Sequence, residues 1–124
     1  DRFYIFDAKY RIQFDSDYVK QYGGPGPTTD DVNTMHRYRD AIAIPHTMKT
    51  GAWKAGSVIG AVALFPYTDE AAYRSQKFFN SIKQVEIGGL PFLPGATTLV
   101  AEKISAILDC VFPEVTTTST EPSD

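Results

Sequence analysis

The chain has 124 residues, of which 43% are hydrophobic and 22% are charged, and its formal net charge at pH 7 is −3. This length fits one domain with one core, and the negative charge argues against a broadly basic nucleic-acid surface without excluding a local basic groove. No stretch approaches the roughly 20 apolar residues of a membrane span. The single cysteine, Cys110, has no partner for an internal disulfide. A reducing, cytoplasmic compartment is the simpler interpretation, with Cys110 predicted as a packed thiol at the buried end of a helix.

The first predicted element is a β-strand over residues 2–13, where aromatic and β-branched residues dominate and no Gly or Pro occurs. Both of its faces are largely apolar up to Asp7, which predicts a central strand covered on both sides. Asp7 and Lys9 are two residues apart, so the pleat points both side chains to the same face. Burying a carboxylate and an ammonium is costly unless they pair or bind a metal. Asp7 and Lys9 are therefore the first candidates for functional residues.

Residues 14–28 are predicted to be a mobile surface connection because Gly and Pro are dense there, and a loop that orders over a substrate is the alternative. Thr and Asp residues at 28–31 then predict a helix that runs to about Ala43 and is ended by Pro45. Arg39 lies at a position of the apolar face of this helix, where a charged residue is out of place.

A loop with two lysines and one tryptophan is predicted at residues 46–56. Lys49 and Lys54 flank Trp53 in this loop. A basic loop that carries an aromatic residue can contact a phosphate backbone. The alternative, which the residues alone favour, is an ordinary surface loop with Trp53 folded inward.

The rest of the chain continues the alternation of strands and helices. The remaining predicted elements are a buried strand at 57–66, a helix at 70–81, a short strand followed by a bend at 85–95, and a helix at 97–110. This alternation predicts an α/β fold. The predicted domain covers residues 1–114, and residues 115–124 are predicted to be a disordered tail because they contain no apolar anchor.

The spacing of Asp7 and Lys9 is compatible with phosphodiester chemistry. Mg²⁺ usually takes one or two carboxylates together with phosphate and water oxygens. A lysine on the same strand face can hold or deprotonate an attacking water, or stabilise negative charge in a phosphoryl transition state. Asp-x-Lys is a short and common motif, so by itself it does not separate this chemistry from a structural ion pair.

Longer stretches carry a more specific pattern. The sequences FDAKYR at 6–11 and DDVNTMHRYRDAI at 30–42 resemble a branch of the PD-(D/E)XK nuclease superfamily that is related to McrBC-type restriction components. ALFP at 63–66 and IGGLPFLPG at 87–95 resemble the same branch in the same order. The resemblance implies a restriction-endonuclease-like mixed sheet flanked by helices. It also implies a Mg²⁺-dependent DNA endonuclease of restriction or phage-defence type, with Mn²⁺ as an alternative metal.

The resemblance also implies roles for individual residues. Asp7 matches the metal-binding acid of the second half-motif, with the Ala8 carbonyl as a second ligand, and Lys9 matches the catalytic lysine. On the following helix, Tyr38 matches a catalytic tyrosine; without the resemblance it would be predicted as a core residue. The candidate substrate contacts are His36 and Arg39 on that helix and Lys49 and Lys54 in the basic loop.

The first half-motif of the superfamily is an aspartate on the preceding strand. Asp1 is too close to Asp7 to supply it, since one strand cannot turn back within so few residues. We therefore expect this sequence to be a C-terminal portion that lacks the N-terminal elements of the fold. Two alternatives stay open: a non-catalytic module for DNA binding or subunit assembly, and an unrelated α/β domain with a buried Asp7–Lys9 pair. The expected partners are DNA and an NTPase or specificity subunit, with a homodimer as a further expectation.

Overall fold

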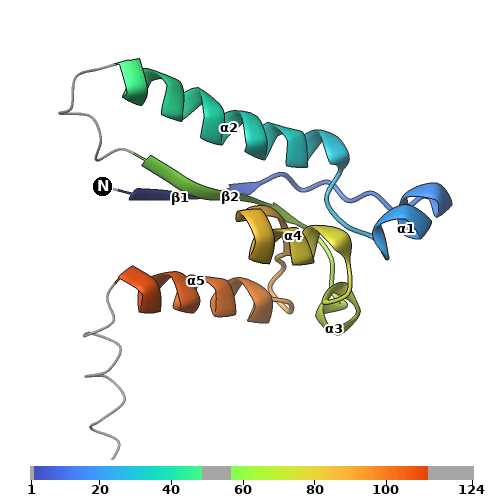
Figure 1. Ribbon diagram of the computed structural model, residues 1–124. Helices are drawn as coiled ribbons and strands as arrows, with labels where there is room; N and C mark the ends of the chain where they lie inside the picture. Colours follow the sequence, from blue (N-terminus) through green and yellow to red (C-terminus); the bar gives the residue numbers. More distant parts are fainter. Residues whose placement is uncertain (1, 49–56, 112–124) are drawn as a thin grey trace, which may run out of the picture.

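The computed structural model describes residues 2–48 and 57–111 (Figure 1). The described elements, in chain order, are β1 (Arg2–Ala8), α1 (Ser16–Tyr22), α2 (Thr29–Met48), β2 (Ser57–Phe65), α3 (Glu70–Tyr73), α4 (Lys77–Val85), β3 (Ile87–Pro91) and α5 (Thr98–Val111). This alternation of strands and helices confirms the predicted α/β class. The predictions for residues 49–56, which include Lys49, Trp53 and Lys54, and for the tail at 115–124 lie outside the described residues.

The three described strands form one sheet in the order β1-β2-β3, and both neighbouring pairs are parallel. The central strand is β2, whose Ala63 lies opposite Asp7 of β1 on one side and Gly89 of β3 on the other. The prediction that the opening strand is central and covered is wrong for the described sheet, because β1 lies at its edge and Phe3 is 50% exposed. The antiparallel pairing of a mixed sheet is not found among these three strands.

Helices cover both faces of the sheet. In Figure 1, α2 lies on one side of the strands, and α4 and α5 lie on the other. The pleat of β2 sends alternate side chains into two clusters. The cluster beneath α2 contains Val32, Met35, Ala61, Ala63 and Ile87. The cluster beneath α4 and α5 contains Val62, Phe65, Tyr73, Ile82, Leu90, Leu99 and Val100. Small residues of β2 thus face α2, which allows this helix to approach the sheet closely.

The opening strand is shorter than predicted. It ends at Ala8 instead of residue 13, because the chain turns at Tyr10, where φ is 55°. The backbone N–H of Lys9 still donates to the Leu64 carbonyl at 2.9 Å. Lys9 is therefore the last residue of this segment that is tied to the sheet before the chain turns.

The connector at residues 14–28 contains a helix, so the prediction of an irregular mobile loop is wrong for this part. Asp15 caps α1 by accepting a hydrogen bond from the Tyr18 backbone N–H at 3.1 Å, and Gly23 ends the helix with φ of 87°. Tyr18 is buried and its hydroxyl donates to the Pro27 carbonyl. These caps and the buried tyrosine, together with the paired backbone bonds between Gln13 and Gly26, hold a segment that is rich in Gly and Pro.

The second helix continues beyond its predicted end. It runs through Pro45 to Met48, so the prediction that Pro45 ends it is wrong. A proline in the last turn of a helix removes one backbone hydrogen bond, and its fixed φ is compatible with the helix.

The helix predicted at 70–81 is divided into α3 and α4, and Asp69 is the N-cap of α3. Gln76 causes the division, because its backbone is extended and its side chain is fully buried. Its Oε1 accepts from the Phe78 N–H at 2.5 Å, and its Nε2 donates to the Tyr18 hydroxyl at 3.2 Å. A buried amide that bonds to a distant element is not visible in the helical pattern.

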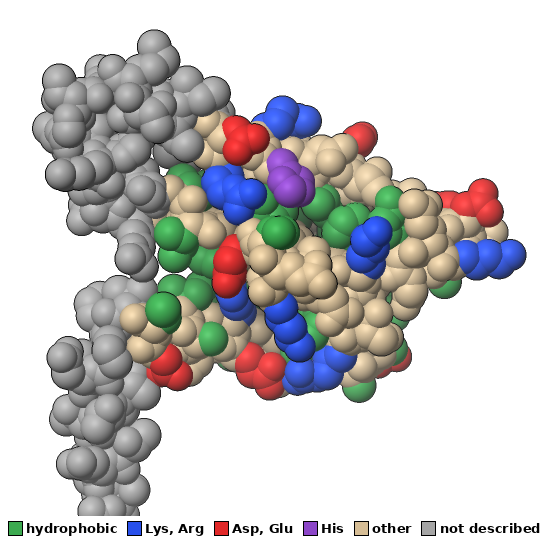
Figure 2. All heavy atoms as spheres, viewed as in Figure 1, with side chains coloured by type: hydrophobic (Ala, Val, Ile, Leu, Met, Phe, Trp, Pro, Cys, Tyr) green, Lys and Arg blue, Asp and Glu red, His purple; other side chains and the backbone are tan. Residues whose placement is uncertain are grey.

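The later elements follow the predictions for strands at 57–66 and within 85–95 and for a helix at 97–110. Cys110 is exposed, so the prediction of a packed thiol is wrong; the last turns of α5 are open to solvent, and Leu108 is 49% exposed. Within the described residues, no helix combines the length and hydropathy needed to cross a bilayer. Figure 2 shows basic and acidic side chains interspersed on one face, in agreement with the small negative net charge.

Candidate active site

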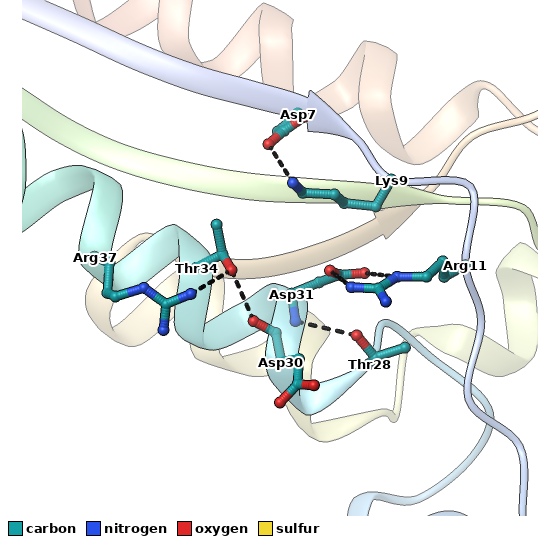
Figure 3. Close-up of polar contacts among 8 residues, drawn as sticks. All are labelled: Asp7, Lys9, Arg11, Thr28, Asp30, Asp31, Thr34 and Arg37. Carbon is teal, nitrogen blue, oxygen red and sulfur yellow. Dashed lines mark hydrogen bonds and ion pairs between the residues drawn. The ribbon is translucent and has the colours of Figure 1, made fainter.

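Asp7 and Lys9 lie at the carboxyl end of β1 and face the same side, as their spacing predicts. The Lys9 ammonium is 3.0 Å from Oδ2 of Asp7 (Figure 3). The Asp7 side chain is 26% exposed and that of Lys9 is 25% exposed. The pair is therefore neither deeply buried nor fully solvated, and an incoming group can reach it without unfolding the strand.

The Asp7 carboxylate affects the protonation of its neighbour. Its hydrogen bond to the Lys9 ammonium holds the pKa of Lys9 above the ordinary lysine value. Negative charge on Asp31 acts in the same direction, with a smaller effect. Lys9 is therefore cationic at neutral pH in this arrangement, which suits a hydrogen-bond donor and a stabiliser of negative charge better than a general base.

The structure brings Tyr38 to this pair. Tyr38 lies on α2 with 36% of its surface exposed, and the Lys9 ammonium is 5.8 Å from the centroid of its ring. This distance is within the range of a cation–π contact. Three of the predicted site residues, Asp7, Lys9 and Tyr38, are thus neighbours, although Tyr38 lies on α2, 29 residues after Lys9 in the chain.

Two further charged residues beside Lys9 were missed by the sequence analysis. Arg11 donates from Nε to Oδ2 of Asp31 at 3.3 Å, and from Nη2 to Oδ1 of the same carboxylate (Figure 3). Asp31 is 1% exposed, and its backbone N–H is bonded to the Thr28 hydroxyl at 3.0 Å. Its helix-start position concealed this burial. The available signal was that Asp31 lies one turn before Met35, which places both on the core-facing side of α2.

The other predicted substrate contacts are not gathered at the Asp7–Lys9 pair in this way. His36 is exposed on α2. Arg39 donates from Nη1 to the Val85 carbonyl at 2.9 Å, at the end of α4 and toward the β3 side of the sheet. This bond explains why a charged residue can occupy the apolar face of α2, because the guanidinium binds a carbonyl at the end of α4. Lys49 and Lys54 lie outside the described residues.

The donor set at the end of β1 fits a divalent metal in part. Asp7 offers a partly exposed carboxylate and Ala8 offers the next backbone carbonyl, and both are the hard oxygen donors that Mg²⁺ prefers. Among residues 2–48 and 57–111, no group of three or more His, Cys, Asp or Glu side chains is placed to hold a metal. A metal here would therefore complete its coordination with water and substrate phosphate, as Mg²⁺ commonly does.

Comparison with known proteins identifies the superfamily to which this chain belongs. The family model described as the PD-(D/E)XK nuclease superfamily matches residues 1–70, more than half of the 124 residues. The chain belongs to the PD-(D/E)XK nuclease superfamily. The match spans the Asp7–Lys9 pair and all of α2, and superfamily membership indicates a nuclease-type function. The alternative of an unrelated α/β domain is therefore wrong. A search of the curated proteins and a search of the solved structures each found no match.

Proposed function

We propose that this chain carries the active site of a metal-dependent DNA endonuclease of restriction or phage-defence type, related to McrBC-type components. The observation that carries the proposal is the contact of a carboxylate, an ammonium and a tyrosine ring at one strand end, in a chain of this superfamily.

In this proposal each residue has one role. Asp7 and the Ala8 carbonyl hold Mg²⁺ or Mn²⁺ as hard oxygen ligands. When bound, the metal supplies Lewis-acid stabilisation of the phosphoryl oxygens and lowers the pKa of a coordinated water. Lys9 donates a hydrogen bond to the attacking water or to the developing negative charge on the phosphate. Tyr38 keeps the ammonium directed toward Asp7 by covering its other side.

Substrate contacts beyond the reacting phosphate are proposed from position and charge. His36 is exposed on the helix that carries Tyr38, and Lys49 and Lys54 follow that helix in the sequence. Arg39 stays a candidate only if it exchanges its bond to Val85 for a contact with DNA. An NTPase or specificity subunit is proposed as a partner, because a net charge of −3 provides little nonspecific attraction to DNA. A homodimer is a further proposal.

The first test is a cleavage assay on the full-length protein with Mg²⁺ or Mn²⁺. Asp7→Asn keeps the shape of the side chain and removes its charge, so we expect the rate of metal-dependent cleavage to fall at least about 100-fold. Lys9→Met keeps the length of the side chain and removes the ammonium, and we expect a loss of similar size. The melting temperature of both variants should stay close to that of the parent.

Matched controls separate this effect from a general change of charge. Asp17→Asn and Lys20→Met remove the same charges from exposed positions of α1. We expect cleavage rates within about twofold of the parent for both. Undiminished cleavage by Asp7→Asn or Lys9→Met would show that the site is elsewhere.

A second candidate function is a non-catalytic module that binds DNA or assembles subunits. It is favoured by the single carboxylate at the end of β1 and by the absence of a three-residue metal cluster in the described part of the chain. This candidate predicts DNA or partner binding that does not depend on Mg²⁺, with no cleavage under any metal. Metal-dependent cleavage that is lost in Asp7→Asn would exclude it.

A further inference from the structure

The chain turns sharply directly after Lys9. Tyr10 has φ of 55°, in the left-handed region that residues with a β-carbon rarely adopt. Its residue surface is 79% exposed, so packing of the ring does not hold this conformation. The contacts that hold it must come from the residues on either side.

Both neighbours of Tyr10 are anchored. On one side, the Lys9 backbone N–H donates to the Leu64 carbonyl of β2 at 2.9 Å. On the other side, the Arg11 guanidinium binds both carboxylate oxygens of Asp31. Asp31 is 1% exposed, so water cannot satisfy its charge and Arg11 must do so. A planar guanidinium that binds two oxygens fixes orientation as well as distance.

The helix that carries Asp31 also carries Tyr38, about two turns further along α2. The contact between Arg11 and Asp31 therefore ties the Lys9 segment to the same rigid element that supplies the tyrosine ring. We propose that Arg11 and Asp31 are positioning residues for the candidate active site, an inference that rests on the proposed nuclease function. They hold the Lys9 backbone against α2, so that the ammonium stays beside Asp7 and Tyr38.

Another role for Arg11 makes a different kinetic prediction. The Arg11 side chain is 58% exposed, so its guanidinium could instead contact a DNA phosphate directly. A group that contacts the substrate equally in the ground state and the transition state changes KM and leaves kcat unaffected. A positioning residue changes kcat, because a displaced catalytic group costs rate after the substrate is bound.

The test compares Arg11→Lys and Arg11→Gln in the full-length protein, with kcat and KM measured on DNA in Mg²⁺. Arg11→Lys keeps the charge but cannot bind both oxygens in one plane, so we expect kcat to fall about threefold to tenfold. Arg11→Gln removes the charge, and we expect a fall of more than about tenfold. KM should stay within about twofold of the parent in both variants.

The matched control is Arg74→Lys. Arg74, the C-cap of α3, donates from Nη2 to both carboxylate oxygens of the exposed residue Glu102 on α5, at 3.1 and 3.2 Å, and both residues are remote in sequence from the candidate site. We expect kcat within about twofold of the parent for Arg74→Lys. An equal fall of kcat in Arg74→Lys and Arg11→Lys would overturn the positioning role, as would a rise in KM at unchanged kcat in the Arg11 variants.

Hydrogen exchange gives a readout that does not depend on cleavage. In Arg11→Gln we expect the backbone amide of Lys9 to exchange at least about tenfold faster, because one of the two anchors of this segment is lost. The amide of Ala101, which donates to the Thr97 carbonyl at 3.0 Å at the start of α5, should keep its rate. Unchanged exchange at Lys9, or faster exchange at both amides, would overturn the proposal. A parent protein that does not cleave DNA while the Lys9 amide responds as expected would refute the nuclease function and leave the positioning contact standing.

Discussion

A carboxylate–lysine contact lies on each face of strand β1, and the two contacts involve different elements. On the α2 face, Asp7 pairs at 3.0 Å with Lys9, two residues further along the chain and directly after β1. On the opposite face, Oε1 of Glu86 accepts from the Tyr4 hydroxyl at 2.9 Å and from the Lys103 ammonium at 2.7 Å. The second contact joins β1 to the turn before β3 and to α5, whereas the first joins no two elements.

This difference indicates which contact serves the fold. A polar contact between distant segments restricts the folded chain, whereas a contact between residues two apart in one strand adds little to tertiary structure. The Glu86 carboxylate is occupied by two donors, even though it borders a hollow of about 280 Å³ that Tyr4, Lys103 and Cys110 help to line. We therefore interpret the Tyr4–Glu86–Lys103 cluster as structural and keep the Asp7–Lys9 pair as the candidate for function. The following changes test this division by their effects on stability and on cleavage.

The largest effect on stability is expected for Gly60→Ala. A β-carbon at Gly60 would lie 2.5 Å from the Tyr4 ring and 2.8 Å from the Glu86 carbonyl oxygen, and a backbone atom cannot move away cheaply. We expect the free energy of unfolding to fall by about 1–3 kcal/mol, measured by urea denaturation. The value of kcat per folded molecule should be unchanged.

The control for this change is Gly95→Ala, because nothing lies within 4 Å of a β-carbon at that position. We expect its stability to stay within about 0.5 kcal/mol of the parent. Equal stability of Gly60→Ala and Gly95→Ala would mean that the cluster is less closely packed than the structure indicates. A loss of kcat at full stability in Gly60→Ala would break the division between the two faces of β1.

A smaller effect is expected for Lys103→Met. Lys103 is 19% exposed in its side chain, and its ammonium lies 5.2 Å from the centroid of the Tyr4 ring as well as on Glu86. Methionine keeps the apolar stem and removes the charge, so we expect a loss of about 1 kcal/mol. Lys9→Met should cost less stability than Lys103→Met and more cleavage activity. The reverse order, measured by denaturation and by cleavage rate, would contradict the interpretation of both contacts.

Sequence patterns predicted the features that depend on neighbouring residues. The spacing of Asp7 and Lys9 predicted their shared face, and the predicted strand at 57–66 and helix at 97–110 agree closely with β2 and α5. The place of Tyr38 beside Lys9 followed from the resemblance, since its helical position alone predicted a core residue. Local pattern and family motif together thus predicted three residues that the structure places side by side.

Features that depend on distant residues were not predictable in this way. The contact between Arg11 and Asp31 joins residues 20 apart, and the break before α4 depends on a buried bond from Gln76 to Tyr18, 58 residues away. The order of strands, which places β2 at the centre, also depends on pairing between segments. In each case the pattern of neighbouring residues was overridden by a tertiary contact with a residue far away in the sequence.

The smallest and most specific prediction concerns alkaline pH. Burial, together with the hydrogen bond to Glu86 and its charge, raises the pKa of Tyr4 well above its ordinary value near 10. The folded state therefore keeps this proton at pH values where the unfolded chain loses it. The stability contributed by Tyr4 is fully present below about pH 10 and decreases as the pH rises further, by up to about 1.4 kcal/mol per pH unit.

Replacing Tyr4 by Phe removes this dependence. At pH 7 we expect Tyr4→Phe to be less stable than the parent by about 1 kcal/mol, because the hydrogen bond to Glu86 is lost. The difference between the two proteins should shrink as urea denaturation is repeated from pH 9 to above pH 10. Tyr10→Phe, a change at a residue that is 79% exposed, is the control and should follow the parent. The Lys103 ammonium lies 5.2 Å from the centroid of the same ring, so the comparison is repeated in the Lys103→Met background to remove its contribution. A constant difference at every pH in both backgrounds would show that the Tyr4 hydroxyl is not held within the cluster, and the structural face of β1 would then rest on packing alone.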